Sequence, residues 1–282
     1  MGQLVLMPTL LFHRGRTYSA CWGRDMYVEK EHRRNKIASR LYDRWVDDFE
    51  VALASGQSPE ARELQNKYGW TVISLIHQYE KLFFRPRYLA DSLKNGIYIA
   101  GKRLLAMMFS EAYRLRPSAT PDVEVKVGRT FDPRVDQLWS ACREQYSNIC
   151  MRDHATLRWR FERHPYANYF VFEAFDKRGT YGGYCVGRIE DDTAFLIDFL
   201  TEREGMGRQM RRALIHAAES HFRSLGVVRV VCRCLSPDFE ASLREAGYLP
   251  TLYTGAMAIK SRLENFPRDE WYVTAADSDL DR

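Results

Sequence analysis

The chain has 282 residues, which at roughly 100–200 residues per domain predicts two domains. Its hydrophobic fraction of 45% is typical of a globular protein that can bury a core. The formal net charge of +5 is mild and forms no concentrated basic stripe, so the composition favours an anionic small ligand and does not indicate nucleic acid.

The first part of the chain, up to residue 84, alternates between extended and helical patterns. The predicted elements are strands at 2–12, 17–22 and 25–28, a helix at 33–46, a strand at 49–54, a helix at 58–68, and strands at 71–76 and 77–84. The second helix begins with Ser58-Pro-Glu, the residues preferred at a helix N-terminus, and stops at Gly69.

Residues 87–115 are mostly helical with an interruption at Asn95-Gly96, and a linker at 117–121 marks the expected domain boundary. These central helices are amphipathic and carry Lys102 and Arg103. They could lie on a membrane surface. We favour packing between the two domains instead, so membrane contact is not expected.

The pattern of strands and helices starts again at residue 123. The predicted elements are a strand at 123–129, helices at 132–146 and 153–162, strands at 169–175, 182–189 and 194–200, a helix at 206–225, a strand at 227–235, a helix at 236–247, and strands at 249–254 and 256–260.

The two parts share the order strands, helix, strand, Ser-Pro-acid helix, Gly-aromatic, strand. Ser58 to Gly69 and Ser236 to Gly247 have the same eleven-residue spacing, and each glycine is followed by an aromatic residue. This self-similarity predicts a divergent internal duplication. The alternative is two unrelated α/β units that share common turn chemistry.

The six cysteines are sparse, and no run approaches the roughly 20 apolar residues of a membrane span. We recognise no signal peptide, so we expect reduced cysteines and a cytoplasmic protein. Cys232 and Cys234 lie two apart in a strand-like run, which simply places them on one face. Without a partner set of His or Cys, we expect no metal.

A candidate phosphate-binding segment follows the strand at 194–200. Gly205 and Gly207 leave the backbone bare at the start of a helix, where unpaired N–H groups and the helix dipole favour a pyrophosphate. Met206, Arg208 and Gln209 complete this candidate site. The alternative is an ordinary tight turn.

The matching segment of the first half is basic and lacks glycine. Its candidate ligand-binding residues are Arg33, Arg34, Lys36 and Ala38 at the start of a helix. The alternative is a solvated basic turn. A lysine also obstructs the close backbone approach to phosphate that glycine allows.

Together these segments resemble the GNAT (Gcn5-related N-acetyltransferase) superfamily, whose members bind acetyl-CoA or another acyl-CoA. The family's pyrophosphate loop has the form (Gln/Arg)-x-x-Gly-x-(Gly/Ala). Arg33 and Ala38 match its ends, with Lys36 in place of the central glycine. The segment from Glu202 to Gly207 keeps both glycines, with Glu202 replacing Gln/Arg.

The resemblance implies an α/β (α+β) protein with two GNAT-like folds, each a mixed central sheet flanked by helices. The expected domains are a truncated GNAT-like domain at 1–84, a helical linker at 85–121, a complete GNAT-like domain at 122–262 and a C-terminal tail at 263–282. The first domain is called truncated because a complete fold starts with a strand and two helices before the strand at residue 2. The tail from Trp271 resembles the ending of GNAT-like proteins from bacterial polysaccharide clusters.

The activity that the resemblance implies is transfer of an acyl group from acyl-CoA to an amine or hydroxyl of a small-molecule or sugar acceptor. Asp198 is the candidate base, and a strand N–H near Leu200 is expected to polarise the thioester carbonyl. Many family members carry a tyrosine general acid where this chain has Gln65 and Leu243.

Two further interpretations concern the second half and the chain as a whole. The Arg- and aromatic-rich segment at 151–165 recognises a carbohydrate-like acceptor or, as we prefer, forms an amphipathic packing helix. Because the second half keeps its glycines, we predict that it binds CoA. The alternative function is a non-catalytic scaffold or partner-binding module.

Overall fold

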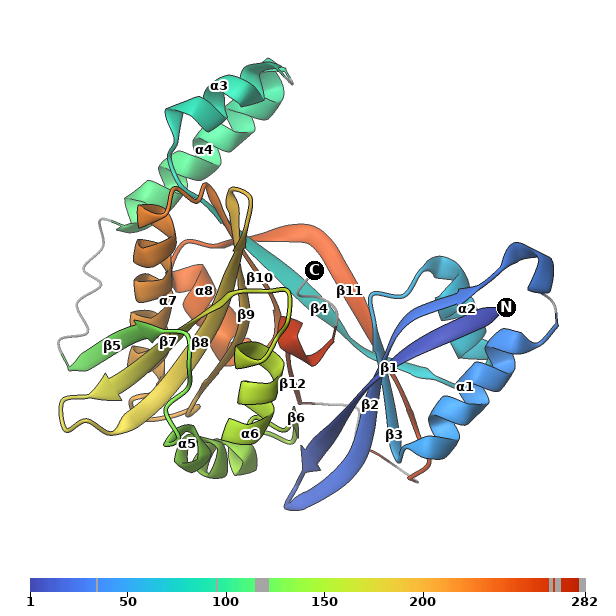
Figure 1. Ribbon diagram of the computed structural model, residues 1–282. Helices are drawn as coiled ribbons and strands as arrows, with labels where there is room; N and C mark the ends of the chain where they lie inside the picture. The colour runs from blue at the N-terminus through green and yellow to red at the C-terminus, as the bar shows by residue number, and fades with distance from the viewer. Residues whose placement is uncertain (34, 95, 115–121, 264–265, 267–269, 279–282) are drawn as a thin grey trace. The chain divides into compact units, whose positions relative to one another are not determined.

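The computed structural model describes residues 1–33, 35–94, 96–114, 122–263, 266 and 270–278 (Figure 1). The chain forms two compact units. Unit 1 comprises Met1–His77, Tyr146–Met151 and Tyr253–Arg282, and unit 2 comprises Gln78–Gln145 and Arg152–Leu252. Each unit therefore combines segments from both parts of the sequence, unlike the continuous domains expected above. Strands and helices alternate in both units, which confirms the α/β class.

Unit 1 is built on a mixed sheet with the strand order β12-β6-β1-β2-β3-β11. Its strands are β1 (Gly2–His13), β2 (Arg16–Val28), β3 (Val51–Ser55), β6 (Asn148–Cys150), β11 (Leu249–Ser261, whose last part belongs here) and β12 (Trp271–Thr274). Its helices are α1 (Ile37–Asp48) and α2 (Pro59–Lys67), with short 3-10 turns at Lys30–His32 and Ala275–Asp277.

Unit 2 contains a second run of strands in the order β4-β10-β9-β8-β7-β5. They are β4 (Thr71–Leu82, whose last part belongs here), β5 (Val123–Gly128), β7 (Tyr169–Asp176), β8 (Tyr181–Glu190), β9 (Thr193–Thr201) and β10 (Arg229–Leu235). The helices are α3 (Pro86–Lys94), α4 (Ile97–Arg114), α5 (Val135–Cys142), α6 (His154–Leu157), α7 (Gly207–Ser224) and α8 (Pro237–Glu245), with a 3-10 turn at Arg143–Gln145 and a π-turn at Arg158–Glu162.

Each unit is completed by a strand from the other part of the sequence. In unit 1, the end of β11 pairs antiparallel with β3, from Met257 opposite Ser55 to Ser261 opposite Val51. In unit 2, the end of β4 lies beside β10, where Arg233 Nε donates to Gln78 Oε1 at 2.7 Å. An exchange of this kind depends on contacts that are distant in sequence, so local patterns did not predict it.

In three places, two consecutive strands that the sequence predicted form one long strand. These long strands are β2, β4 and β11. In β2 the predicted break coincides with a β-bulge, where Asp25 and Met26 lie opposite Leu4 of β1. A bulge interrupts the alternation of side chains without ending the strand. In β4 the burial changes from partly exposed to mostly buried near residue 76, which mimics a strand boundary.

The core of unit 1 is aromatic. The Trp45 ring lies 5.8 Å from that of Tyr42 and 4.7 Å from that of Trp70, between centroids. The Trp45 indole N–H donates to the Cys21 carbonyl at 3.3 Å. A Cβ atom at Gly23 would lie 2.1 Å from the Trp45 ring, so glycine is required for this contact with β2. These contacts fix α1 against the sheet.

In unit 2, a buried ion pair connects β4 to α7. Lys81 Nζ donates to Glu219 at 2.8 Å and to the Ala246 carbonyl at 2.7 Å. The Lys81 side chain is 2% exposed and that of Glu219 is 11% exposed. Burial raises the pKa of Glu219, and Lys81 partly offsets that rise. The exchanged strand therefore supplies the counter-charge for a buried carboxylate.

Replacing Lys81 with methionine should lower the free energy of unfolding by about 3–5 kcal/mol at neutral pH, because Glu219 is left buried without its partner. The native pKa of Glu219 then lies further above its unfolded value of about 4.3. Stability should therefore fall as pH rises from that value through the raised native pKa. Denaturant titration at several pH values measures both effects. Lys67→Met, which breaks an exposed pair with Glu63, is the control and should change little. Equal losses in the two variants would contradict this role for Lys81.

Candidate functional site

The parallel strands β2 and β3 pair over a short stretch and then diverge. Their pairs run from Ala20 opposite Val51 to Trp22 opposite Leu53. Beyond this point β2 continues through its bulge, where Asp25 has a φ of +43°, while β3 ends at Ser55. Two parallel strands that separate in this way leave a V-shaped opening between them.

A cavity of about 240 Å³ lies at this opening, entirely within unit 1. Its walls come from both diverging strands and from the two helices that follow them. The lining residues are Leu4, residues 23–26 of β2, Tyr42 and Trp45 of α1, residues 54–58 at the end of β3 and just after it, and Ala61 and Gln65 of α2.

Several polar groups around the cavity lack hydrogen-bond partners among the described residues. They are Ser55 Oγ, both side-chain polar atoms of Gln57, and Gln65 Oε1, all buried. Gln65 is only 3% exposed. Leaving such a group unsatisfied costs about 1–3 kcal/mol, so these groups indicate a polar ligand or ordered water in the cavity.

Tyr42 is a cavity residue that the sequence interpretation treated only as part of an apolar helix face. Its side chain is 3% exposed, and burial raises the pKa of its hydroxyl, while a hydrogen bond with Gln65 partly lowers it. Gln65 occupies the position at which many members of the GNAT superfamily carry a tyrosine general acid. The structure thus brings a phenol from α1 next to the position on α2 that lacks one.

One residue of the loop before α1, Lys36, has a left-handed backbone conformation that glycine usually adopts. Lys36, the N-cap of α1, is left-handed with φ 57° and ψ 20°, close to the φ of +60° at Gly205. A non-glycine residue in this region costs about 1–2 kcal/mol. Ala38 lies in the first helical turn, whose N–H groups have no partner within the helix. Arg33 Nε donates to the Val28 carbonyl at 3.1 Å, and Arg34 lies outside the described residues.

In unit 2 the corresponding parallel strands also diverge, but side chains fill the opening. Strands β9 and β10 pair from Thr193 opposite Arg229 to Leu196 opposite Cys232, and a bulge follows in β9. Beyond it, the rings of Phe199 and Phe239 stack with centroids 3.3 Å apart, and each is only 1% exposed.

The predicted duplication matches Phe239 with Ala61 and Leu243 with Gln65 of unit 1. The two helices have the same length and the same Ser-Pro start. In unit 1, the small Ala61 side chain therefore leaves the space that Phe239 occupies in unit 2. Gln65 likewise gives unit 1 a side-chain amide at the position where unit 2 has the apolar Leu243.

The loop before α7 is held by the protein's own groups. Arg211, 5% exposed, donates to the Glu202 carbonyl at 2.7 Å and to Thr201 Oγ1 at 2.9 Å. A Cβ atom at Gly207 would lie 1.9 Å from the Glu202 carbonyl oxygen, so this close backbone approach already requires glycine. The need for glycine at position 207 is therefore explained by this backbone contact and does not require a bound phosphate.

The other predicted ligand residues of the second half have separate surroundings in unit 2. Arg208 pairs with Glu245 at 2.7 Å, and Gln209 is exposed. Leu200 is fully buried in β9, while Met206 is the N-cap of α7.

Asp198, the predicted base, lies inside unit 2. Its side chain is 2% exposed, like that of Arg152, whose Nε lies 3.1 Å from Asp198 Oδ1. The Tyr184 hydroxyl donates to the other carboxylate oxygen at 2.8 Å. A base must reach the proton that it removes, so these contacts favour a structural role for Asp198 in this arrangement.

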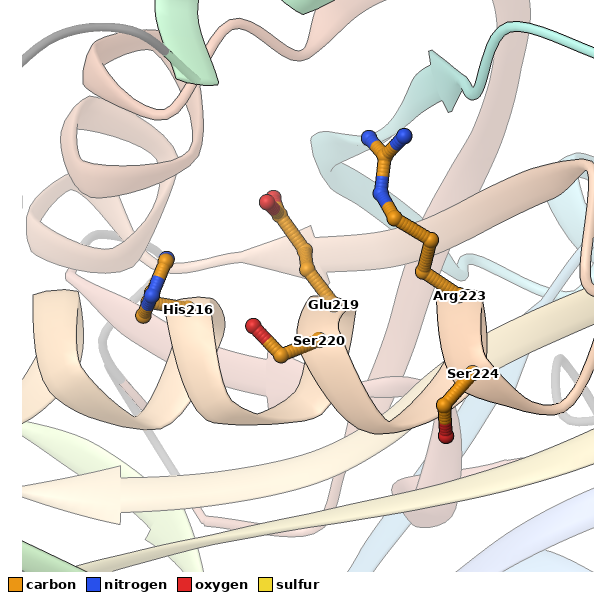
Figure 2. A pocket seen from close by; sticks show the side chains of 5 residues that line it. All are labelled: His216, Glu219, Ser220, Arg223 and Ser224. Carbon is orange, nitrogen blue, oxygen red and sulfur yellow. The ribbon is translucent and has the colours of Figure 1, made fainter.

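Two other groups of ionisable side chains lie outside this cavity. A second cavity, of about 320 Å³, lies along one face of α7 and is lined by His216, Glu219, Ser220, Arg223 and Ser224 (Figure 2). Its two charged groups are committed elsewhere, Glu219 to Lys81 and Arg223 to Glu111 at 2.6 Å. Ligand atoms of Glu29, Glu31 and His32 lie within 4.8 Å of one another at the surface, and Glu29 accepts a hydrogen bond from the N-terminal amine. We assign no ligand to either grouping.

No family model matches the sequence, and no curated protein matches it. Solved structures do match. Saccharomyces cerevisiae N-myristoyltransferase with bound myristoyl-CoA has a TM-score of 0.62 at 12% identity, covering 92% of this chain and 63% of that one. A probable N-acyltransferase from Enterococcus faecalis V583 has a TM-score of 0.62 at 12% identity, covering 92% and 59%.

A GCN5-related N-acetyltransferase from Anabaena variabilis ATCC 29413 has a TM-score of 0.60 at 12% identity, covering 92% of this chain and 59% of its own. The chain therefore has the GNAT-like acyltransferase fold that the sequence predicted. It spans about 59–63% of the length of these three proteins.

Asp198→Ala should lower the free energy of unfolding by about 3–5 kcal/mol, because it leaves the Arg152 guanidinium buried without its partner. Chemical denaturation followed by circular dichroism measures this loss. Asp238→Ala is the control, since it removes the partner of Arg203 from a half-exposed pair and should cost less. A variant that keeps full stability but loses all acyl transfer would instead establish Asp198 as the base.

Proposed function

We propose that the protein is an acyl-CoA-dependent acyltransferase whose acyl-CoA binds in unit 1, between the diverging ends of β2 and β3. This proposal replaces our sequence-based preference for the second half. The observation that carries it is the cavity at this opening, where Ser55 Oγ, both polar atoms of the Gln57 side chain and Gln65 Oε1 are buried and have no hydrogen-bond partner among the described residues. The pantetheine arm of CoA carries two amides, and side-chain amides and hydroxyls offer both donors and acceptors to them.

The pyrophosphate of CoA would lie at the start of α1. The left-handed Lys36 turns the loop so that the first N–H groups of the helix are available, and the helix dipole favours an anion there. Arg33 and Lys36 add positive charge, and both are exposed. In this proposal the Lys36 side chain is compatible with phosphate binding, because the φ of Lys36 is close to that of Gly205 and its side chain is exposed.

The chemistry follows from the position of the bulge. The acceptor's amine or hydroxyl attacks the thioester carbonyl, whose oxygen is polarised by a backbone N–H of the bulged strand near Met26. Collapse of the tetrahedral intermediate breaks the C–S bond. Asp25, the carboxylate among the lining residues, accepts the proton of the acceptor directly or through water, and the Tyr42 hydroxyl protonates the leaving thiolate.

Unit 2 has a different role in this proposal. The stacked Phe199 and Phe239 fill its opening, and Arg211 ties its loop to the strand end. These features support the scaffold interpretation for the second half alone. We propose a small molecule or sugar with an amine or hydroxyl as the acceptor.

Ala61→Phe should weaken acyl-CoA binding, because it gives unit 1 the residue that fills the corresponding space of unit 2. We expect affinity for acetyl-CoA and longer acyl-CoAs to fall by at least tenfold, about 1.4 kcal/mol, in isothermal titration. Arg62→Phe, one position along on the exposed side of the same helix, should bind like the wild type. Undiminished binding by Ala61→Phe would remove the proposed site.

Ala38→Asp tests the phosphate end separately. An aspartate in the first turn is favourable for the helix itself, so the variant should fold normally while repelling the pyrophosphate. We expect weaker binding of acyl-CoA but unchanged binding of pantetheine-thioester analogues that lack phosphate. Equal effects on both ligands would indicate a general distortion, and no effect on either would contradict the proposed location.

Tyr42→Phe should lower kcat by about 10²–10⁴-fold with KM for acyl-CoA little changed, since only the hydroxyl is removed from a ring that packs against Trp45. Release of CoA thiol in the presence of a panel of amines and amino sugars provides the assay. Tyr68→Phe, on an adjacent ring of the same cluster, is the matched control. Full activity in Tyr42→Phe would exclude the phenol as the acid.

A further inference from the structure

Helix α4 turns its apolar side to solvent. Its large exposed side chains recur at helical spacing on one face, with exposed fractions of 84% for Ile97, 73% for Tyr98, 68% for Leu105, 59% for Met108 and 40% for Phe109. In an ordinary surface helix the apolar stripe faces the core and the charged residues face water. In α4 a further apolar face lies in water, although Ala100 and Met107 are buried on another side of the helix.

The opposite side of α4 is held by specific polar contacts. Arg103 donates to Ser92 Oγ of α3 at 2.7 Å. Farther along, Glu111 pairs with Arg223 of α7 at 2.6 Å. Rotating the helix to hide its apolar face would break these contacts, so the exposure belongs to the folded arrangement of unit 2. Figure 1 shows α3 and α4 running side by side as a hairpin.

Cations accompany the exposed apolar face. Lys102 is exposed and lies with its Nζ 4.6 Å above the Tyr98 ring. On α3, Arg87 and Lys94 are exposed, near Leu93, which is 55% exposed. The acids of the hairpin are Asp91, which pairs with Lys94, and Glu111, which pairs with Arg223. The hairpin therefore presents apolar and aromatic side chains together with an excess of positive charge.

We propose that the α3–α4 hairpin docks on the surface of an anionic lipid bilayer. Ile97, Leu105 and Met108 would enter the boundary between headgroups and acyl chains, while Tyr98 and Lys102 lie at headgroup level. Basic residues beside an apolar helix face are what an anionic leaflet attracts. Within the described residues, no helix combines the length and apolarity needed to cross a bilayer.

The sequence alone left this possibility open and favoured packing between domains. The present proposal differs because it uses the exposure of the side chains. An amphipathic pattern predicts that apolar residues such as Leu105 and Met108 face a protein core, but the folded hairpin leaves them in water. A second copy of the chain is the other partner that an apolar face suits. The excess of cations beside the face favours lipid, since two identical basic surfaces repel each other.

Flotation of the full chain with lipid vesicles tests the proposal. We use phosphatidylcholine vesicles with and without about 30% phosphatidylglycerol, at low and high salt. The wild-type protein should float with the anionic vesicles. The amount of protein that floats with the neutral vesicles should be at least tenfold lower. The double variant Leu105→Ser/Met108→Ser and the charge reversal Lys102→Glu should each reduce binding to the anionic vesicles by tenfold or more.

Tyr166→Ser is the control, because it removes an aromatic side chain that is 93% exposed elsewhere in unit 2, and it should bind like the wild type. The substituted residues are all exposed, so circular dichroism should show unchanged folding. Absence of wild-type binding to anionic vesicles would overturn the proposal, as would binding that the double variant retains. A wild-type dimer that the double variant converts to a monomer in light scattering would overturn it in favour of a second copy.

Discussion

The divergence of two parallel strands is the constraint on which both units depend. Where β2 leaves β3, and where β9 leaves β10, the space between the strands must be occupied by something other than backbone. In unit 2 the stacked rings of Phe199 and Phe239 occupy it. In unit 1 small and polar side chains leave a cavity, and this contrast suggests that one half serves as a scaffold while the other holds a ligand.

The two halves of the sequence each contribute a strand to the unit that is formed mainly by the other half. The end of β11 completes the sheet beside β3, and the end of β4 supplies Lys81 to the buried Glu219. Neither half of the sequence therefore contains all of its own core. In the second half, Arg211 and Gly207 make contacts within unit 2, although their segment resembles a phosphate site.

Local chemistry predicted much of the fold. The Ser58 cap is confirmed, with its Oγ accepting from the Ala61 N–H at 3.2 Å, and the break between α3 and α4 falls where Asn95-Gly96 predicted it. The short strands β6 and β12 were missed because they have too few residues to show alternation. The cavity was missed because it depends on which side chains several separate elements bring together. Likewise, the sequence could not reveal that Arg152 pairs with Asp198, or that Lys36 adopts a glycine-like conformation.

Hydrogen exchange measured by mass spectrometry, with and without acyl-CoA, tests the central claim most directly. The two candidate regions lie on separate peptides, so one experiment compares them in the same molecule. We predict that ligand slows exchange in peptides covering residues 23–28, 36–42 and 54–65, while peptides covering 199–212 remain unchanged. Protection confined to residues 199–212 would contradict the account and return the acyl-CoA site to the second half.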